Sequence, residues 1–288
     1  MMLDPYALFI APFADFSFMQ RALWGCLVLS VSATPVGVFL TLRRMSLTGD
    51  AMSHAILPGA AIGFLISGVS VTAMTIGGVV AGCIVALLAG VVARHSNAEE
   101  DSSLAAFYLI SLALGVVIIS TKGSNIDLLH VLFGSTLALN NDALILLTSI
   151  ATISLLTLAL LYRPLVMECV DPAFFRSVSR LSAVAHYGFL LLVVLNLVAG
   201  FHALGTLMAV GLMLLPAAVA RFWTARLGGM LVIAFLTSVI SSYLGLFISF
   251  HASFATSPSI ILVMGVAYIV SLLFGRQSGL LLKNNLIN

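Results

Sequence analysis

The stretch "RRMSLTGDAMSHAILPG", residues 43–59, interrupts a chain that is otherwise dominated by apolar residues. It places Asp50 and His54 four positions apart, so a helix would bring both side chains onto one face. Long apolar runs flank it on both sides. The fold must therefore accommodate a carboxylate and an imidazole between segments that avoid charge.

The composition predicts an integral membrane protein. Of the 288 residues, 61% are hydrophobic and 8% are charged, and the mean hydropathy is +1.20, far outside the range of soluble domains. A membrane helix needs about 20 mostly apolar residues, and runs of that length recur along the chain. Strands of a transmembrane barrel would alternate with a period of two, which these runs do not. We therefore expect an all-α, polytopic transmembrane helical bundle.

About nine membrane helices are expected, within one membrane domain that spans residues 1–288. The N-terminal segment lacks a basic region and carries Asp4 and Asp15, so we interpret it as a short interfacial segment and not as a cleaved signal peptide. The expected helices cover residues 19–42, 51–68, 71–93, 104–121, 142–162, 182–200, 203–221, 226–249 and 257–275.

The basic residues predict the orientation. If Arg43 and Arg44 are cytoplasmic, alternation of nine crossings leaves only Arg21 and Lys122 outside, so ten of the twelve basic residues lie inside. Such an excess of cytoplasmic Lys and Arg is typical of membrane proteins. We expect the N-terminus outside and the C-terminus in the cytoplasm.

Motifs of common enzymes are missing. Neither lysine fits a GxxxxGK[ST] phosphate loop, because Lys122 is followed by glycine and Lys283 by asparagine. No histidine is followed by glutamate, which excludes the HExxH pattern, and no GxSxG elbow is present. We expect no catalytic residues, no permanently bound cofactor and no nucleic-acid partner.

One hydrophilic segment is unusual. "RPLVMECVDPAFFRSVSR", residues 163–180, is predicted to be cytoplasmic, and Asp171 followed by Pro172 is typical of a helix start. A short helix parallel to the membrane would expose Phe174 and Phe175. These rings suit the groove of a partner protein, and they equally suit contact with lipid headgroups.

The stretch from 43 to 65 resembles the signature of the permease subunit of the zinc and manganese uptake ABC transporters, bacterial metal importers related in fold class to the vitamin B12 importer. Three further stretches resemble the family in order: "IDLLHVLFGSTLAL" (126–139), "DPAFFRSVS" (171–179) and "ALGTLMAVGLMLLPAAVARF" (203–222). Phe175 and Ser179 stand where the family pattern has a small residue and glycine. The stretch "FHASFATSPS" (250–259) retains only Pro258 of a family Asp-x-Pro-x-Gly-Pro pattern.

The resemblance implies a complex in a bacterial inner membrane. Two permease copies would sit in the lipid with a cytoplasmic ATPase subunit on each and a metal-binding protein outside. The ATPase would dock on segment 163–180, through Asp171, Pro172, Phe174, Phe175 and Arg176. The function implied is ATP-driven import of a divalent transition metal as transported substrate, Zn²⁺ first and Mn²⁺ second.

For the metal pathway the resemblance points to Asp50, His54 and Asp127. Imidazole suits zinc, and a carboxylate also accommodates manganese. Two ligands bind too weakly to trap an ion, as a conduit requires. Weaker candidates are His130, His202 and His251. The alternative for Asp50 and His54 is structural: a hydrogen-bonded pair that closes the turn after Gly49, or a helix cap made by Asp50.

Two other functions stay open. A secondary transporter or channel for divalent cations would work without an ATPase. A non-catalytic membrane scaffold would tolerate the loss of Asp50 and His54.

Overall fold

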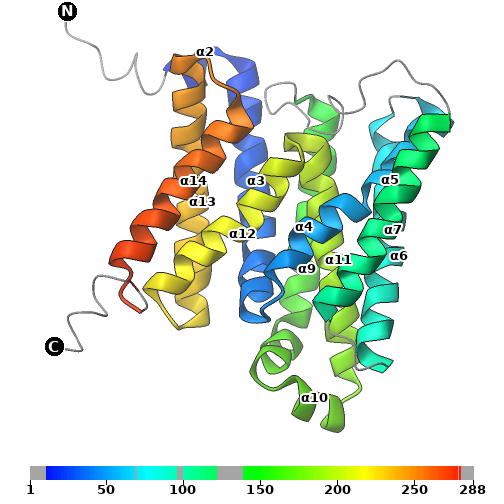
Figure 1. The fold of residues 1–288 in the computed structure, drawn as a ribbon. Helices are drawn as coiled ribbons and strands as arrows, with labels where there is room; N and C mark the ends of the chain where they lie inside the picture. Colours follow the sequence, from blue (N-terminus) through cyan, green and yellow to red (C-terminus); the bar gives the residue numbers. More distant parts are fainter. Residues whose placement is uncertain (1–10, 69, 96–99, 122–138, 278, 280–288) are drawn as a thin grey trace, which may run out of the picture.

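A computed structural model describes residues 11–68, 70–95, 100–121, 139–277 and 279. Within these ranges the chain is built of helices and contains no strand, which confirms the expected all-α bundle (Figure 1). The helices are α2 (Ala11–Asp15), α3 (Ser17–Leu42), α4 (Ser46–Ala55), α5 (Leu57–Ser67), α6 (Val71–His95), α7 (Glu100–Thr121), α9 (Asn141–Val170), α10 (Pro172–Val178), α11 (Leu181–Leu204), α12 (Thr206–Trp223), α13 (Leu227–Ala252) and α14 (Thr256–Phe274).

Eight stretches of the described chain are long and apolar enough to cross a membrane, and α4 and α5 together form one of them. The ninth expected span corresponds to α7. Its apolar part, Ser102–Ile118, is shorter than the other eight spans. Seventeen residues reach roughly 26 Å at the rise of an α-helix, slightly less than a hydrocarbon core of about 30 Å.

The predicted bounds of the second helix, 51–68, are wrong in detail. The helix begins earlier, at Ser46, and divides at Ile56 into α4 and α5. Pro58 explains the division, because proline has no N–H to donate to the carbonyl of His54. Ser111 of α7 donates a hydrogen bond to the carbonyl of Ala55 at 3.0 Å, so a neighbouring helix satisfies the backbone at the break.

The expected cytoplasmic segment 163–180 is also wrong in part. Helix α9 does not end at residue 162 but continues to Val170, with Pro164 inside it. Apolar residues on both sides of Arg163 keep the helical pattern, and a proline in a membrane helix is tolerated where neighbours re-satisfy the backbone. Only α10 and the turns beside it remain outside α9 and α11.

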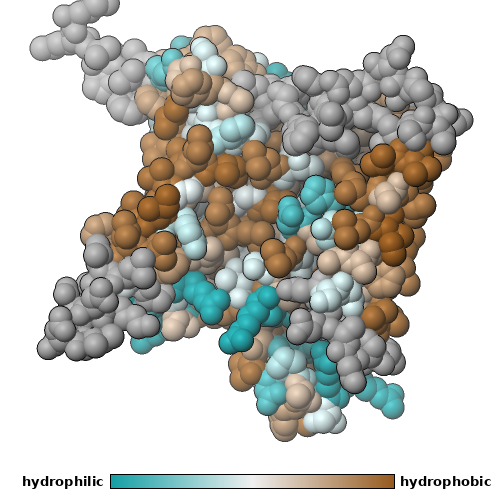
Figure 2. Space-filling view, viewed as in Figure 1, coloured by the Kyte–Doolittle hydropathy of each residue, from teal (hydrophilic) through white to brown (hydrophobic). Residues whose placement is uncertain are grey.

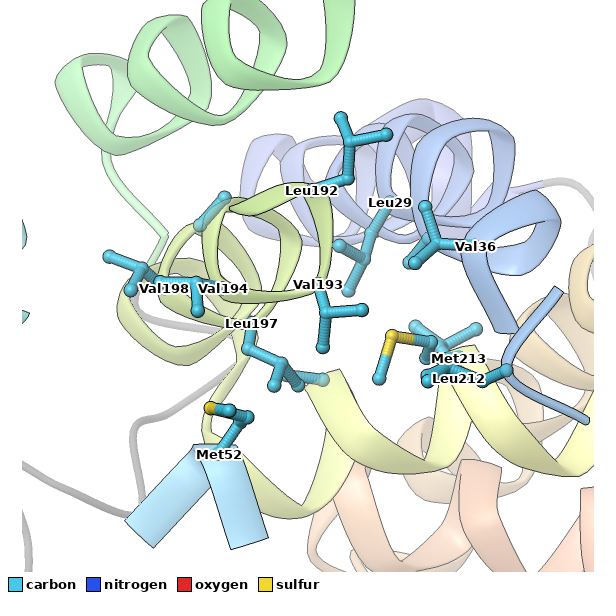
Figure 3. Close-up of a cluster of buried hydrophobic side chains, with 14 of the residues drawn as sticks. Leu29, Val36, Met52, Leu192, Val193, Val194, Leu197, Val198, Leu212 and Met213 are labelled. Carbon is cyan, nitrogen blue, oxygen red and sulfur yellow. The ribbon is translucent and has the colours of Figure 1, made fainter. Parts of the chain in front are cut away.

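The core lies where α3, α11 and α12 meet (Figure 3). Leu29 and Val36 of α3, Leu197 of α11 and Leu212 of α12 are fully or almost fully buried there. Met52 of α4 reaches the same cluster, which anchors the helix that carries Asp50 and His54 to the core.

Helices α5 and α6 approach each other closely. A Cβ atom on Gly59 would collide with the backbone carbonyl of Gly77, and one on Gly77 would collide with that of Gly59. Glycine at both positions therefore lets the two helices pack backbone to backbone, as is common between membrane helices. The "LPG" of residues 57–59 is explained by a break and a contact together.

On the face seen in Figure 2, hydrophobic side chains cover much of the described surface between the two ends of the bundle. Large exposed apolar side chains cover the helices that face outward, among them Ile76, Leu114, Leu160, Leu262 and Val266. Such a belt suits lipid, not water. Helix α10 projects beyond the rest of the bundle at one end (Figure 1).

Candidate metal pathway and coupling helix

Asp50 and His54 lie one turn apart on α4. His54 Nε2 is 3.9 Å from Asp50 Oδ1, and the two side chains are 44% and 68% exposed respectively. Neither side chain is buried in the core, although Met52 and Ala55 of the same helix are fully buried. One face of α4 is therefore packed, and its opposite face presents a carboxylate and an imidazole.

These two side chains line a cavity of about 380 Å³ between α4 and α12. Ser53 of α4 and Thr206 of α12 are its other polar residues, and Ile261 of α14 closes one side. The remaining wall is apolar and comes from α12: Leu207, Val210, Gly211, Leu214 and Leu215. In Figure 2 a small hydrophilic patch beside α4 stands within a mostly hydrophobic face. A cation at this cavity would meet few polar groups besides these.

Asp50 also borders a second, smaller cavity of about 140 Å³ between α4 and α7. Tyr108 of α7 lines it, and its ring centroid lies 6.1 Å from that of His54. The phenol is thus close to both ionisable side chains. The sequence pattern gave no sign of Tyr108, because it lies more than fifty residues away in an apolar helix.

The structure argues against both structural explanations of the pair. Asp50 is the fifth residue of α4, not its cap; that place is taken by Met45, which makes no side-chain cap hydrogen bond. The 3.9 Å between His54 and Asp50 is too long for a hydrogen bond. The carboxylate therefore remains available to a ligand.

The other candidate ligands are not gathered at this site. Asp127 and His130 lie outside the described residues, and His202 is described only as part of the backbone of α11. His251 is exposed in the last turn of α13, where its Nδ1 lies 3.0 Å from the carbonyl oxygen of Phe247. Among the described residues no group of three or more His, Cys, Asp or Glu is placed to hold a metal ion.

Within the segment 163–180, in which ATPase docking was expected, Pro172–Val178 form α10. Asp171 caps this helix by accepting a hydrogen bond from the N–H of Phe174 at 2.9 Å, and Pro172 occupies its first turn, as predicted. Phe174 is 56% exposed, but the expectation that Phe175 is exposed is wrong: it is 8% exposed and packs into the core. Ser179, in place of glycine, has an extended backbone that any residue adopts.

Comparison with known proteins places this architecture. A polytopic helical bundle with a sparse polar pair in an apolar cavity suits a membrane permease, because ionisable side chains within a membrane protein mark ion pathways. The chain belongs to the ABC 3 transport family, because the model of that family matches residues 15–275. It is a multi-pass permease of the bacterial inner membrane, and the family expected from residues 43–65 is confirmed.

Relatives match over nearly the whole chain. The manganese transport system membrane protein MntC of Halalkalibacterium halodurans is 33% identical over 270 residues, 93% of this chain and 91% of that protein. The chelated iron transport system membrane protein YfeD of Yersinia pestis is 32% identical over 271 residues, 94% of this chain and 90% of that protein. Among solved structures, PsaBC from Streptococcus pneumoniae, in complex with Fab, has a TM-score of 0.82 at 29% identity, covering 97% of this chain and 99% of that chain.

Proposed function

We propose that this chain is the permease of an ABC importer that moves a divalent transition metal into the cytoplasm through the cavity beside Asp50 and His54. One observation carries the proposal: an exposed carboxylate and imidazole, 3.9 Å apart, line a cavity whose other residues are mostly apolar. Ionisable side chains in a membrane protein are costly, and they mark ion pathways by default.

Manganese is the first candidate substrate and iron the second. The donor set of Asp50 and His54 suits several divalent ions, so it does not order them. The relatives named above transport manganese or chelated iron, and the expectation of zinc before manganese finds no support among them. Zinc therefore becomes a comparison ion in the experiment.

The complex we propose has two copies of this permease, an ATPase subunit bound at each α10 and a metal-binding protein on the outer side. Helix α10 suits an ATPase, because it projects from the bundle (Figure 1). Its Phe174 and Arg176 are exposed. The second copy is carried over from the family resemblance of the sequence, and Asp50 and His54 of one chain give the sparse ligand set that a conduit requires.

The test is metal uptake by cells in which this transporter is the main manganese importer. Asp50→Asn keeps the size and hydrogen bonding of the side chain but removes its charge, and His54→Gln removes the imidazole nitrogen. Either change is expected to lower manganese uptake by about tenfold or more, because each removes a large share of a sparse coordination shell. Asp142→Asn, at an exposed position in the first turn of α9, is the matched control and should transport normally.

Protein amounts in the membrane must be equal for all variants, measured by immunoblot. If both Asp50→Asn and His54→Gln take up manganese, iron and zinc at the wild-type rate, the pair is structural and the proposed pathway is overturned. Uptake that persists after deletion of the ATPase gene would instead favour a secondary transporter or channel.

A further inference from the structure

A buried charged cluster, separate from the cavity beside α4, joins three helices near α10. It consists of Arg43, Glu168, Ser182 and His186. The side chains of Arg43 and Glu168 are 7% and 1% exposed, and Ser182 and His186 are 1% and 0% exposed as residues. Charged groups at such depth are expensive in a membrane protein and call for a specific role.

The contacts are directional. Arg43 Nη2 lies 2.7 Å from His186 Nδ1 and 4.0 Å from Glu168 Oε1, and its guanidinium stands 5.1 Å from the ring centroid of Phe189. An arginine only donates, so Nδ1 of His186 accepts and the imidazole proton is on Nε2. The hydroxyl of Ser182 donates to Glu168 Oε2 at 2.9 Å.

Glu168 and Ser182 close the base of the hairpin that presents α10. Glu168 precedes the cap residue Asp171 by three positions, and Ser182 is the second residue of α11. Their hydrogen bond therefore ties the end of α9 to the start of α11. A carboxylate in the last turn of a helix is disfavoured by the helix dipole, so Glu168 does not serve to stabilise α9 itself.

Arg43 connects this base to α4. It is the residue directly after α3, and the chain enters α4 only three residues later, at Ser46. The turn is tight: the N–H of Met45 donates to the carbonyl of Leu40 at 2.9 Å, and Arg44 adopts a left-handed backbone with φ of 59°. A displacement of Arg43 would thus be passed to α4, which bears Asp50.

We infer that Arg43, Glu168 and His186 are positioning residues that transmit movement of α10 to the metal-site helix α4. This inference rests on the proposed function, in which an ATPase moves α10 and a metal ion passes Asp50. Charged groups that exchange partners when α10 shifts would couple the position of α10 to that of α4. Apolar side chains have no fixed partners, so they would slide past one another without such coupling.

The experiment measures manganese transport and ATP hydrolysis by the complete complex in proteoliposomes. The first variant is Glu168→Gln, which keeps the acceptor for Ser182 but removes the charge. The second combines Arg43→Met with Glu168→Met, because an apolar pair often replaces a buried ion pair without loss of stability. Both variants are expected to hydrolyse ATP while transport per ATP falls about tenfold.

A matched control is available on the same two helices. Asn196 of α11 donates to Ser154 of α9 at 2.6 Å, and both are buried, but the pair lies away from α10. Asn196→Leu combined with Ser154→Ala should keep the wild-type ratio of transport to hydrolysis. If the cluster were merely structural, its variants would lower the amount of folded complex and leave the ratio of transport to hydrolysis unchanged.

Wild-type transport per ATP in the Arg43→Met, Glu168→Met variant would overturn the inference. If neither the Glu168→Gln variant nor the double methionine variant assembles, Ser182→Ala decides, since it removes only the hydrogen bond across the base of α10. An unchanged ratio of transport to hydrolysis in Ser182→Ala overturns the inference, and a lowered ratio supports it. Failure of the wild-type complex to transport manganese, iron or zinc would refute the proposed function instead, and the inference with it.

Discussion

Phe174 and Phe175 are neighbours in α10, yet Phe174 is 56% exposed and Phe175 is 8% exposed. The helix therefore has one ring that points away from the bundle and one that holds it to the core. The two positions would therefore separate the proposed docking of the ATPase from the folding of α10, whereas the sequence alone showed one aromatic pair.

Phe174→Asp is predicted to abolish coupling without unfolding the permease. The charge would enter the interface with the ATPase, where a buried unpaired carboxylate is costly. Co-purification of the ATPase subunit with the variant should fall sharply, while the amount of permease in the membrane stays the same. Metal uptake at the wild-type rate would remove α10 from the transport mechanism.

Phe175→Ala is predicted to destabilise the permease without preventing binding of the ATPase. Removal of a buried ring costs about 3–5 kcal/mol of stability, so the melting temperature of the detergent-purified permease should fall. The variant that still folds should retain the ATPase, because the exposed ring is intact. An unchanged melting temperature would mean that α10 is not packed as described.

The predicted orientation is tested with single cysteines in a background in which Cys26, Cys83 and Cys169 are replaced. Ser177 in α10 and Ser253 between α13 and α14 are both exposed, and they belong to opposite sides in the predicted topology. A membrane-impermeant thiol reagent, applied to cells with a permeabilised outer barrier, should label Ser253→Cys and spare Ser177→Cys. Equal labelling of both would refute the orientation.

Much of this fold was predictable because hydrophobic length decides it. All eight stretches of the described chain that are long and apolar enough to cross a membrane were predictable, since a run of about 20 apolar residues has few alternatives. It missed the start of α4 at Ser46 and the end of α9 at Val170, because the polar residues there keep helical geometry while packing against other helices. Hydropathy reports burial in lipid and not the hydrogen bonding of the backbone.

The candidate site was predictable only in part. Asp50 and His54 share a local spacing, so the sequence could pair them. Arg43, Glu168 and His186 are scattered over more than 140 positions, and only the fold brings them together. In the sequence Arg43 served only as a marker of orientation, and its burial, with a side chain 7% exposed, had no sequence signal. Long-range polar contacts of this kind leave no periodic signal.

The approach of α5 to α6 yields the last prediction. Gly59→Ala would place a methyl group against the carbonyl of Gly77, where backbone, not a flexible side chain, blocks it. Overpacking of this kind typically costs about 1–3 kcal/mol, and here it would also push α5 away from α6 just beyond the break at Ile56. Gly265→Ala in α14 is the matched control, because a Cβ there would meet no heavy atom within 4 Å. Thermal unfolding of both variants in the same detergent should show a lower midpoint for Gly59→Ala and an unchanged or higher one for Gly265→Ala, since alanine favours a helix over glycine. Equal midpoints would show that Gly59 is not needed for the contact, and the "LPG" at residues 57–59 would then be explained by the proline break alone.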